Sequence, residues 1–292
     1  MSKRILLPLA ALVAASAVAA AVATAGGSKP AATAVAAANC PTVSSGTLTI
    51  GTDNPAYPPW YAGGSKSSWK INDPSTGKGY ESAVAYAIAG KLGYQKSHVK
   101  WIYVPFNKAF APGSKSFDFD INQISYTPAR AKVVDFSKSY YDVNQAVVVN
   151  KGTKIASVRG IKGLRSYKLG AQLGTTSYAF IKSRIKPSQS PAVFPTNAGA
   201  VLALKNKQID GLVVDLPTAF YVTAVQVPKG KILGQFENTG GASTDHFGVV
   251  LQKGNPLTAC VNRAITSLRA NGTLKKLQRL WLAKATGAPI LK

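Results

Sequence analysis

Apolar residues along the chain follow two periods, one typical of strands and one typical of helices. Leu48 to Asp53 and Val99 to Tyr103 have the short patterns of strands. Between them, Glu81 begins a segment whose apolar side chains recur every four residues until Gly93, which predicts a helix with a glycine stop. Farther along, Ile209 to Val214 is a nearly continuous apolar run, which predicts a strand buried on both faces. Strands and helices that alternate in this way predict an α/β fold.

The remaining elements are predicted from the same two periods. Further strands are predicted at 117–121, 146–149, 168–171, 231–236 and 247–251. Further helices are predicted after Gly174, after a cap at Asn197, at 257–268 and at 274–282. Residues 62–79 form a Gly, Ser and Lys-rich insert around Trp69, for which we predict an extended hairpin or flap.

The first residues are unlike the rest of the chain. Lys3 and Arg4 precede an Ala, Val and Leu-rich run that ends at about Ala25 with the small residues of a cleavage site. This pattern predicts a secretory signal peptide over residues 1–25, with a retained membrane helix as the alternative. Residues 26–45 are rich in Ala, Gly, Ser and Thr, which predicts a disordered tether. The protein is therefore expected outside the cytoplasm, secreted or held at the cell envelope.

The chain has two cysteines, Cys40 and Cys260. In an exported protein, such a pair suggests one disulfide, here between the N-terminus and a C-terminal helix. Two free thiols remain an alternative, as does a lipid-modified Cys40, although Asn39 fits poorly before a lipidated cysteine. With His98 and His246 as the only histidines, a Cys/His metal site has too few ligands, so no metal is expected.

Charge is the strongest compositional bias. Lys and Arg number 35 against 11 Asp and Glu, which gives a formal net charge of +24. The cations are scattered along the chain and accompany no nucleic-acid-binding motif, so nucleic acid is not the expected partner. We expect a solvated basic surface that associates with anionic cell-wall polymers or lipid headgroups.

Three stretches carry candidate binding chemistry. Arg130 follows Ser125, Thr127 and Pro128 near the start of a helical turn, where a guanidinium and hydroxyls can converge on a carboxylate, although a surface Arg is the common alternative. Gly174 to Ser177 opens a helix with free N–H groups and the hydroxyls of Thr175 and Thr176, which suits an anion but also an ordinary cap. The third stretch lies at the carboxyl end of a predicted strand.

Asp215 follows a buried strand at its carboxyl end, where open α/β sheets place ligands, or else it caps the next helix. The proline-rich loop Asn54 to Trp60 displays aromatic side chains, including Tyr57 and Trp60. Such aromatics either fill the local core or line a binding cleft, and both interpretations stay open.

Taken in order, these motifs resemble one family. LTIGTDNPAYPPW, GYESAVAYAIAGKLG, FDFDINQISYTPARAKVVDFSKSYY, LGAQLGTTS, KNKQIDGLVVD and NPLTACVNRAI…NGTLKKLQRLWL are similar, across about 47–282, to the amino-acid-binding class of extracytoplasmic solute-binding proteins that serve ABC importers. Each motif alone is weak evidence, and their order is specific.

The resemblance implies a type II Venus-flytrap fold, in which two α/β lobes are joined by two hinge crossings. Lobe one would hold residues 46–142 and 244–292, and lobe two residues 146–240, with crossings near 141–145 and 240–245. A free amino acid would bind between the lobes of a monomer without a cofactor and be delivered to a membrane permease.

The resemblance also implies site roles. Arg130 looks like the partner of the ligand α-carboxylate, helped by Ser125 and by Thr176 of the other lobe, and Asp215 looks like the acceptor of the α-ammonium. Tyr57 and Phe106 resemble aromatic walls, with Asp53 at the pocket floor. The other residues expected there are Gln123, Trp60 and Thr175. Gln123 stands where small hydroxyl residues are common, so the side-chain preference stays open among basic, polar and aromatic ligands.

Two other functions share this fold. Relatives include dehydratases and proteins fused to peptidoglycan lyases, but Glu81 and Glu237 are the only glutamates, and no Ser/His/Asp spacing or acid–base pair stands out. We therefore expect no enzymatic activity. A ligand-sensing domain of a receptor is the remaining alternative.

Overall fold

The computed structural model describes residues 40–66, 68–237, 245–283 and 287–292. The predicted signal peptide, most of the predicted tether and most of the second predicted crossing lie outside these residues. Within the described ranges, no helix is both long enough and apolar enough to span a membrane.

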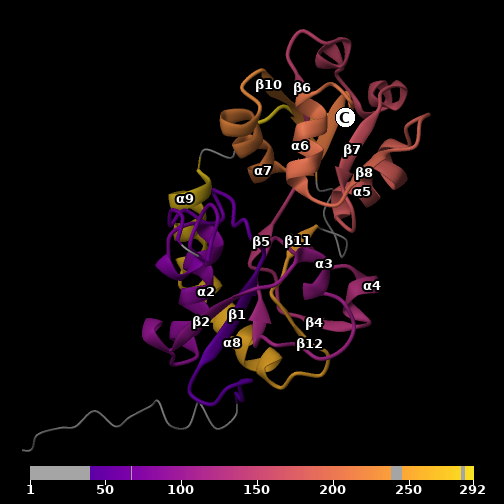
Figure 1. Cartoon of the computed structure of the whole chain (residues 1–292). Coiled ribbons are helices and arrows are strands. Elements are labelled where there is room, and N and C mark those ends of the chain that lie inside the picture. The colour runs from indigo at the N-terminus through magenta and orange to yellow at the C-terminus, as the bar shows by residue number, and fades with distance from the viewer. Residues whose placement is uncertain (1–39, 67, 238–244, 284–286) are drawn as a thin grey trace, which may run out of the picture. The chain divides into compact units, whose positions relative to one another are not determined.

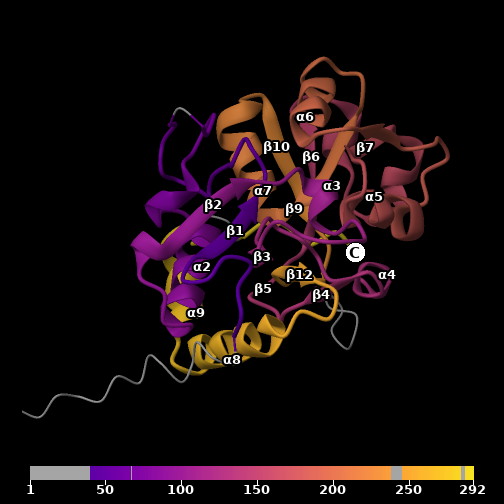
Figure 2. The same cartoon turned by 60° about the horizontal axis from the view of Figure 1, so that its bottom comes forward.

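One five-stranded sheet, which we call lobe one with its helices, has the order β2-β1-β3-β12-β4. Its first three strands are parallel, and β12 runs antiparallel to β3 and β4. Helices α2, α8 and α9 pack together beside it (Figures 1 and 2). The bounds are β1 Leu48–Thr52, β2 Val99–Tyr103, β3 Phe119–Asp120, β4 Val134–Phe136, β12 Val250–Gln252, α2 Tyr80–Lys91, α3 Phe106–Ala109, α4 Pro128–Ala131, α8 Leu257–Ala270 and α9 Thr273–Leu282.

The second five-stranded sheet, lobe two, has the order β10-β6-β9-β7-β8. Strand β6 reads QAVVVN and is almost wholly buried between its two antiparallel neighbours, as its apolar run predicts. The bounds are β6 Gln145–Asn150, β7 Leu169–Gln172, β8 Ala192–Phe194, β9 Gly211–Asp215, β10 Gly230–Gln235, α5 Thr176–Phe180, α6 Asn197–Lys205 and α7 Leu216–Tyr221. Thr196, not Asn197, caps α6, because its hydroxyl accepts the Gly199 N–H at 3.1 Å.

A short two-stranded ladder joins the chain between these sheets. Strand β5 (Tyr141–Asp142) leads directly into β6 of lobe two, and it pairs antiparallel with β11 (His246–Phe247), which leads into β12 of lobe one. The predicted two-lobe α/β fold is therefore confirmed, and the first predicted crossing coincides with this ladder.

The N-terminal end of the described chain corrects the tether prediction. Cys40 is buried and forms the predicted disulfide with Cys260 of α8. Three residues later, the backbone N–H of Val43 donates to the Asp118 carboxylate at 2.6 Å. Residues 40–45 are thus part of lobe one, because the disulfide and this carboxylate hold them there.

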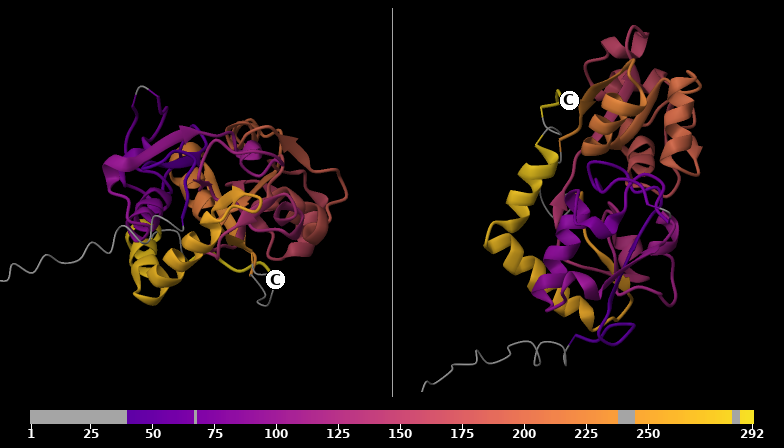
Figure 3. Two further views of the ribbon diagram at one scale, coloured as in Figure 1. Left: turned by 90° about the horizontal axis from the view of Figure 1, so that it is seen from below. Right: turned by 60° about the vertical axis from the view of Figure 1, so that its left-hand side comes forward.

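The C-terminal end corrects a second prediction, since its last residues lie on lobe two and not on lobe one. Ile290 pairs in parallel with Gln235 at the free edge of β10, and the Leu291 N–H donates to the Gln235 carbonyl at 2.8 Å. Leu291 is buried in the core of lobe two, and the Lys292 carbonyl accepts the Ile161 N–H at 3.0 Å. The right panel of Figure 3 shows this terminus beside lobe two, beyond the end of α9.

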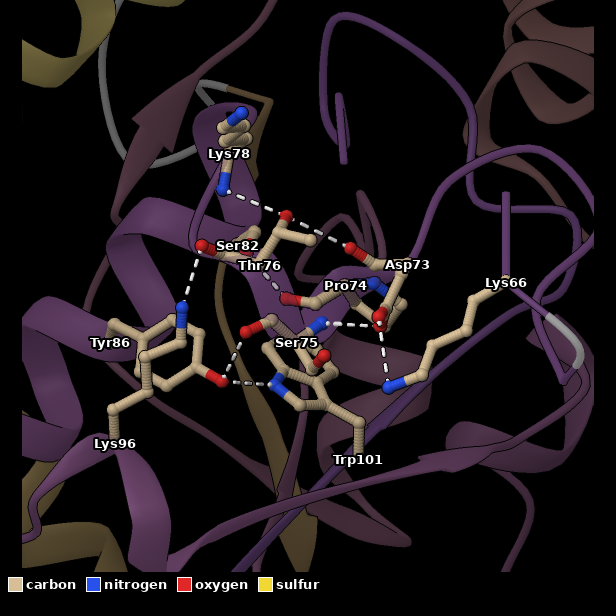
Figure 4. Close-up of polar contacts among 10 residues, drawn as sticks. All are labelled: Lys66, Asp73, Pro74, Ser75, Thr76, Lys78, Ser82, Tyr86, Lys96 and Trp101. Carbon is tan, nitrogen blue, oxygen red and sulfur yellow. Dashed lines mark hydrogen bonds and ion pairs between the residues drawn. The ribbon is translucent and has the colours of Figure 1, made fainter. Parts of the chain in front are cut away.

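The insert around Trp69 folds back onto lobe one. Lys66 and Trp69 form an isolated antiparallel bridge, and the Trp69 side chain is buried, so the insert is a short pinned turn and not an open flap. Asp73 pairs with Lys66 at 3.5 Å and accepts the Ser75 N–H. Further contacts in Figure 4 join residues 74–76 to Ser82 and Tyr86 of α2 and to Lys96, and Trp101 of β2 donates to the Tyr86 hydroxyl.

Candidate functional site

A cavity of about 240 Å³ lies between the two lobes and is lined by side chains of both. Of the residues predicted for the site, it brings together Asp53, Tyr57, Phe106, Gln123, Ser125, Arg130, Thr175, Thr176 and Asp215. It adds Asn54, Pro55, Tyr103, Asn122, Gln172, Ser177, Thr196, Asn197, Ala198, Val214 and Thr218. A cavity of this size suits a small molecule, because each liquid water occupies about 30 Å³.

Arg130 is held by both lobes. Thr127 caps α4 by accepting the Arg130 N–H, which fixes where the side chain leaves the helix. The guanidinium donates to the Ser125 carbonyl at 2.6 Å and, across the cleft, to the Gly174 carbonyl at 2.7 Å. It also stacks 4.1 Å above the Phe110 ring. Burial lowers the Arg130 pKa to about 10, which leaves it a cation at neutral pH.

The hydroxyls beside Arg130 also meet across the cleft. The Ser125 and Thr176 hydroxyl oxygens lie 3.1 Å apart, one from each lobe. Thr175 caps α5, since its hydroxyl accepts the Tyr178 N–H. Gly174 has φ +78°, and a side chain there would collide with Asn107 of lobe one at 2.5 Å. The left-handed backbone and the nearby Asn107 side chain therefore favour a glycine at this contact between the lobes.

Asp215 lies at the carboxyl end of β9 and precedes α7, but its side chain makes no capping hydrogen bond. The carboxylate instead accepts a hydrogen bond from Gln145 Nε2 at 2.7 Å. Burial, with a further contribution from the charge of Asp245, raises the Asp215 pKa to about 8. A cation that enters the cavity would stabilise the ionised form of this carboxyl group, and Arg130 is a cation already near it.

Gln145 and Asp245 form a hydrogen-bonded group with Asp215 that sequence reasoning missed. Gln145 Nε2 also donates to the Asp245 carboxylate at 3.0 Å, while its oxygen accepts from the Ser177 hydroxyl at 2.6 Å. Burial also raises the Asp245 pKa. The available signal was a polar residue at each predicted crossing, immediately beside an apolar strand.

The loop and helix on the lobe-one side supply the remaining wall. The Asp53 carboxylate accepts the Asn54 N–H at 2.7 Å, and burial raises its pKa. Tyr57 approaches Tyr221 of lobe two, with ring centroids 6.0 Å apart. Phe106, the first residue of α3, lies 5.9 Å from the Arg130 guanidinium. The wall therefore combines one carboxylate with aromatic faces.

Gln123 is fixed by a buried carboxylate behind the cavity. Its backbone is left-handed, with φ +48°, and its N–H and side-chain amide donate to Glu81 at 2.7 and 2.6 Å. The Tyr140 hydroxyl donates to the same carboxylate. Burial raises the Glu81 pKa to about 7, against the opposing effect of these donors. These hydrogen bonds therefore fix the orientation of Gln123 at the cavity wall.

Trp60 does not join the cavity. It is 1% exposed and packs edge-on against Tyr80, Tyr141 and Phe247, at centroid distances of 5.6 to 6.0 Å. Its indole N–H reaches Thr218 of lobe two at 3.3 Å. The loop aromatics thus divide between the two roles that the sequence left open, since Trp60 fills the core and Tyr57 lines the cavity. Alternation along the loop could not reveal this, because the partners of Trp60 come from distant segments.

The cavity combines one guanidinium with two carboxylates, Asp53 of lobe one and Asp215 of lobe two. In the described ranges, no group of three or more His, Cys, Asp or Glu side chains could hold a metal ion. A small molecule that carries both an anionic and a cationic group can satisfy Arg130 and Asp215 at once. It can do so only while the lobes are together, since the two residues belong to different lobes.

Comparison with known proteins shows what the chain is similar to. A family model described as bacterial extracellular solute-binding proteins, family 3, matches residues 48–284. The glutamine-binding protein of a Bacillus subtilis (strain 168) ABC transporter is 27% identical over 218 residues, which cover 73% of this chain and 76% of that protein.

Solved structures agree as well. An ancestral arginine-binding protein bound to glutamine has a TM-score of 0.65 and 30% identity, covering 81% of this chain and 97% of that one. An ancestral amino acid-binding protein that preceded cyclohexadienyl dehydratase has a TM-score of 0.64 and 26% identity, covering 81% and 95%.

Proposed function

The chain belongs to family 3 of the bacterial extracellular solute-binding proteins, and from this membership we propose that it is the amino-acid receptor of an ABC importer. The observation that carries the proposal is the pair of opposite charges, Arg130 and Asp215, on opposite walls of one cavity. A free amino acid carries one negative and one positive group within one small molecule. The similar proteins named above bind amino acids, which supports this ligand class.

We assign the α-carboxylate of the ligand to Arg130, with the Ser125 and Thr176 hydroxyls beside it. The α-ammonium is assigned to Asp215, which Gln145 orients. With both groups placed, Asp53 remains as an additional carboxylate on the lobe-one wall. This remaining charge favours a polar or basic side chain over an acidic one, and Tyr57 and Phe106 would contact its aliphatic part.

Binding is coupled to the lobes in this proposal. Ligand binding adds contacts that exist only while the lobes are together, so it shifts the population toward the closed form. The bend would occur at the β5–β11 ladder, where the chain passes between the two sheets. The membrane permease would then recognise the closed form. The receptor itself would be an exported monomer.

Catalysis is the competing proposal, because one similar structure is a precursor of a dehydratase. Asp215, with its pKa raised to about 8, is the one cavity residue suited to proton transfer near neutral pH. Its hydrogen bond to Gln145 and its place opposite Arg130 are those of a charge partner for a ligand, so we propose binding and not turnover. Product formation from a bound candidate, detected by mass spectrometry, would reverse this choice.

A calorimetric screen against the twenty amino acids, with opines and polyamines, tests the function. At least one amino acid is expected to bind, whereas its decarboxylated and its N-acetylated analogues should each bind at least thirtyfold more weakly. Each analogue lacks one of the two charged groups, and loss of one partner from a desolvated charge pair costs about 2–5 kcal/mol. Equal affinity for the amino acid and both analogues would contradict the proposal.

A further inference from the structure

Lobe two carries a surface of unbalanced positive charge away from the cavity. The sequence has no acidic residue between Asp142 and Asp210, although the same interval is rich in Lys and Arg. Six of these cations lie on or beside two short helical segments and are all exposed. We call them the basic face: Arg159, Lys162, Arg165, Lys182, Arg184 and Lys186.

Two adjacent helical segments display the basic face. The 3-10 helix η4 (Ile161–Ser166) places Lys162 and Arg165 on one side, because residues three apart are eclipsed in this kind of helix. The π-helix η5 (Ile181–Ile185) carries Lys182 and Arg184. Arg165 Nε donates to the Ile185 carbonyl at 3.0 Å, which joins the two segments. The cations therefore form one surface and not two separate ones.

Apolar side chains hold this surface against lobe two. Leu164 of η4 and Ile181 and Ile185 of η5 are fully buried in one hydrophobic cluster. With the apolar sides of both segments packed inward, their charged side chains point to solvent. Lys182 and Arg184 lie over the rings of Tyr178 and Phe180, at 5.7 and 5.9 Å. In the part of the chain that the structure describes, none of the six cations forms an ion pair.

The basic face is also separate from the ligand cavity. The segment η4 precedes β7, whereas Gln172 of the cavity ends this strand and Thr175 and Thr176 follow it. The two sites thus lie at opposite ends of the same strand, and changes to one can be tested without altering the other.

We propose that the basic face docks lobe two on anionic phospholipid headgroups of a membrane surface. A patch of uncompensated Lys and Arg attracts such a surface, with about 1 kcal/mol contributed by each cation near it. The disulfide adds a second argument, since the sulfur of Cys40 is bonded to Cys260 and cannot carry a lipid. A face that binds lipid headgroups would hold such a receptor near a membrane permease without that lipid, and this part of the argument depends on the proposed function.

Vesicle sedimentation tests the proposal with residues 33–292, which form one compact unit containing every described helix and strand. The vesicles are phosphatidylcholine with or without about 30% phosphatidylglycerol, which supplies the negative surface potential of an anionic leaflet. Binding is expected only with the anionic lipid and should fall steeply as salt is raised.

The decisive variant replaces Arg159, Lys162, Lys182 and Arg184 with Gln. It should bind the anionic vesicles about 600-fold more weakly, at about fivefold for each of the four cations removed. A matched variant of lobe one replaces the exposed Lys91, Lys100, Lys275 and Lys276 with Gln and should lose less than threefold. Amino-acid affinity, measured separately by calorimetry, should be unchanged in both.

Three results would overturn the proposal. Equal losses in the two variants would show that net charge acts without a defined face. Absence of binding to anionic vesicles would exclude a membrane as the partner of the basic face. Binding to a soluble phosphodiester polymer but not to vesicles would assign the basic face to a wall polymer instead. None of these results bears on whether the cavity binds an amino acid.

Discussion

The cavity and the basic face carry opposite electrostatic designs within one chain of net charge +24. The cavity sets a single guanidinium, Arg130, among the carboxylates of Asp53 and Asp215. The basic face consists of cations that are all exposed to solvent. Charge in the cavity is partly desolvated and directional, so it selects a ligand, whereas exposed charge is screened by salt and favours a surface. The net charge alone describes neither region.

The sharpest way to break this comparison is to remove one charge from the cavity. Arg130→Ala or Asp215→Ala should weaken amino-acid binding by at least thirtyfold in calorimetry, because the remaining ligand charge would be buried without its partner. The exposed residues Arg184 and Asp210 serve as matched controls, and Arg184→Ala and Asp210→Asn should bind normally. Normal affinity in both cavity variants would reject their assigned roles.

Much of this picture follows from local sequence, and the rest depends on distant contacts. The apolar periods located the main strands and helices, and every predicted ligand residue except Trp60 lines the cavity. Gln145 was not predicted for the site, because a polar residue before AVVV looks like a strand end, and only the fold brings Asp215 and Asp245 to it. Leu291 lies in a short segment without periodicity, so its pairing with β10 could not be predicted.

The pH dependence of binding should sharpen the comparison. Because the pKa of Asp215 is raised to about 8, ligand binding requires loss of its proton at lower pH, and affinity should fall about tenfold per unit from pH 8 to pH 6. The neutral Asp215 carboxyl also stabilises the ligand-free fold relative to the unfolded chain at low pH. This contribution is lost as the pH rises through about 8. Calorimetry across this range in low salt measures the first effect.

A variant of the neighbouring carboxylate tests the assignment to Asp215. Asp245→Asn removes a nearby negative charge that raises the Asp215 pKa, so its affinity profile should move toward lower pH. Glu81, with its pKa raised to about 7, titrates in the same interval in both proteins. It should therefore not alter the difference between their affinity profiles. An affinity that stays constant from pH 6 to pH 8 would contradict the prediction.

Two fully buried carboxylates of lobe one offer a test by stability. Glu81 accepts hydrogen bonds from Gln123 and Tyr140, whereas both oxygens of Asp120 lack a partner in the described structure. Glu81→Leu should therefore lower the free energy of unfolding by about 3–5 kcal/mol, and Asp120→Leu should raise it by about 1–3 kcal/mol. Denaturant unfolding measures both changes. Destabilisation by Asp120→Leu would contradict the prediction for this carboxylate.

The smallest expected effect concerns the C-terminal residues that support the basic face. Leu291 is 6% exposed and Ile290 is 43% exposed, and the Lys292 carbonyl pairs with Ile161 of η4. Leu291→Ala should cost about 2 kcal/mol of stability, and Ile290→Ala should cost less than about 1 kcal/mol. Equal losses at the two positions in thermal unfolding would argue against the docked tail.

A crystal structure of the protein with the amino acid that binds most tightly tests the central claim most directly. The account predicts that the ligand lies between the lobes, with its carboxylate about 2.7–3.2 Å from the Arg130 guanidinium and its ammonium at the same distance from the Asp215 carboxylate. A bound amino acid that touches neither residue, or that contacts one lobe alone, would contradict it.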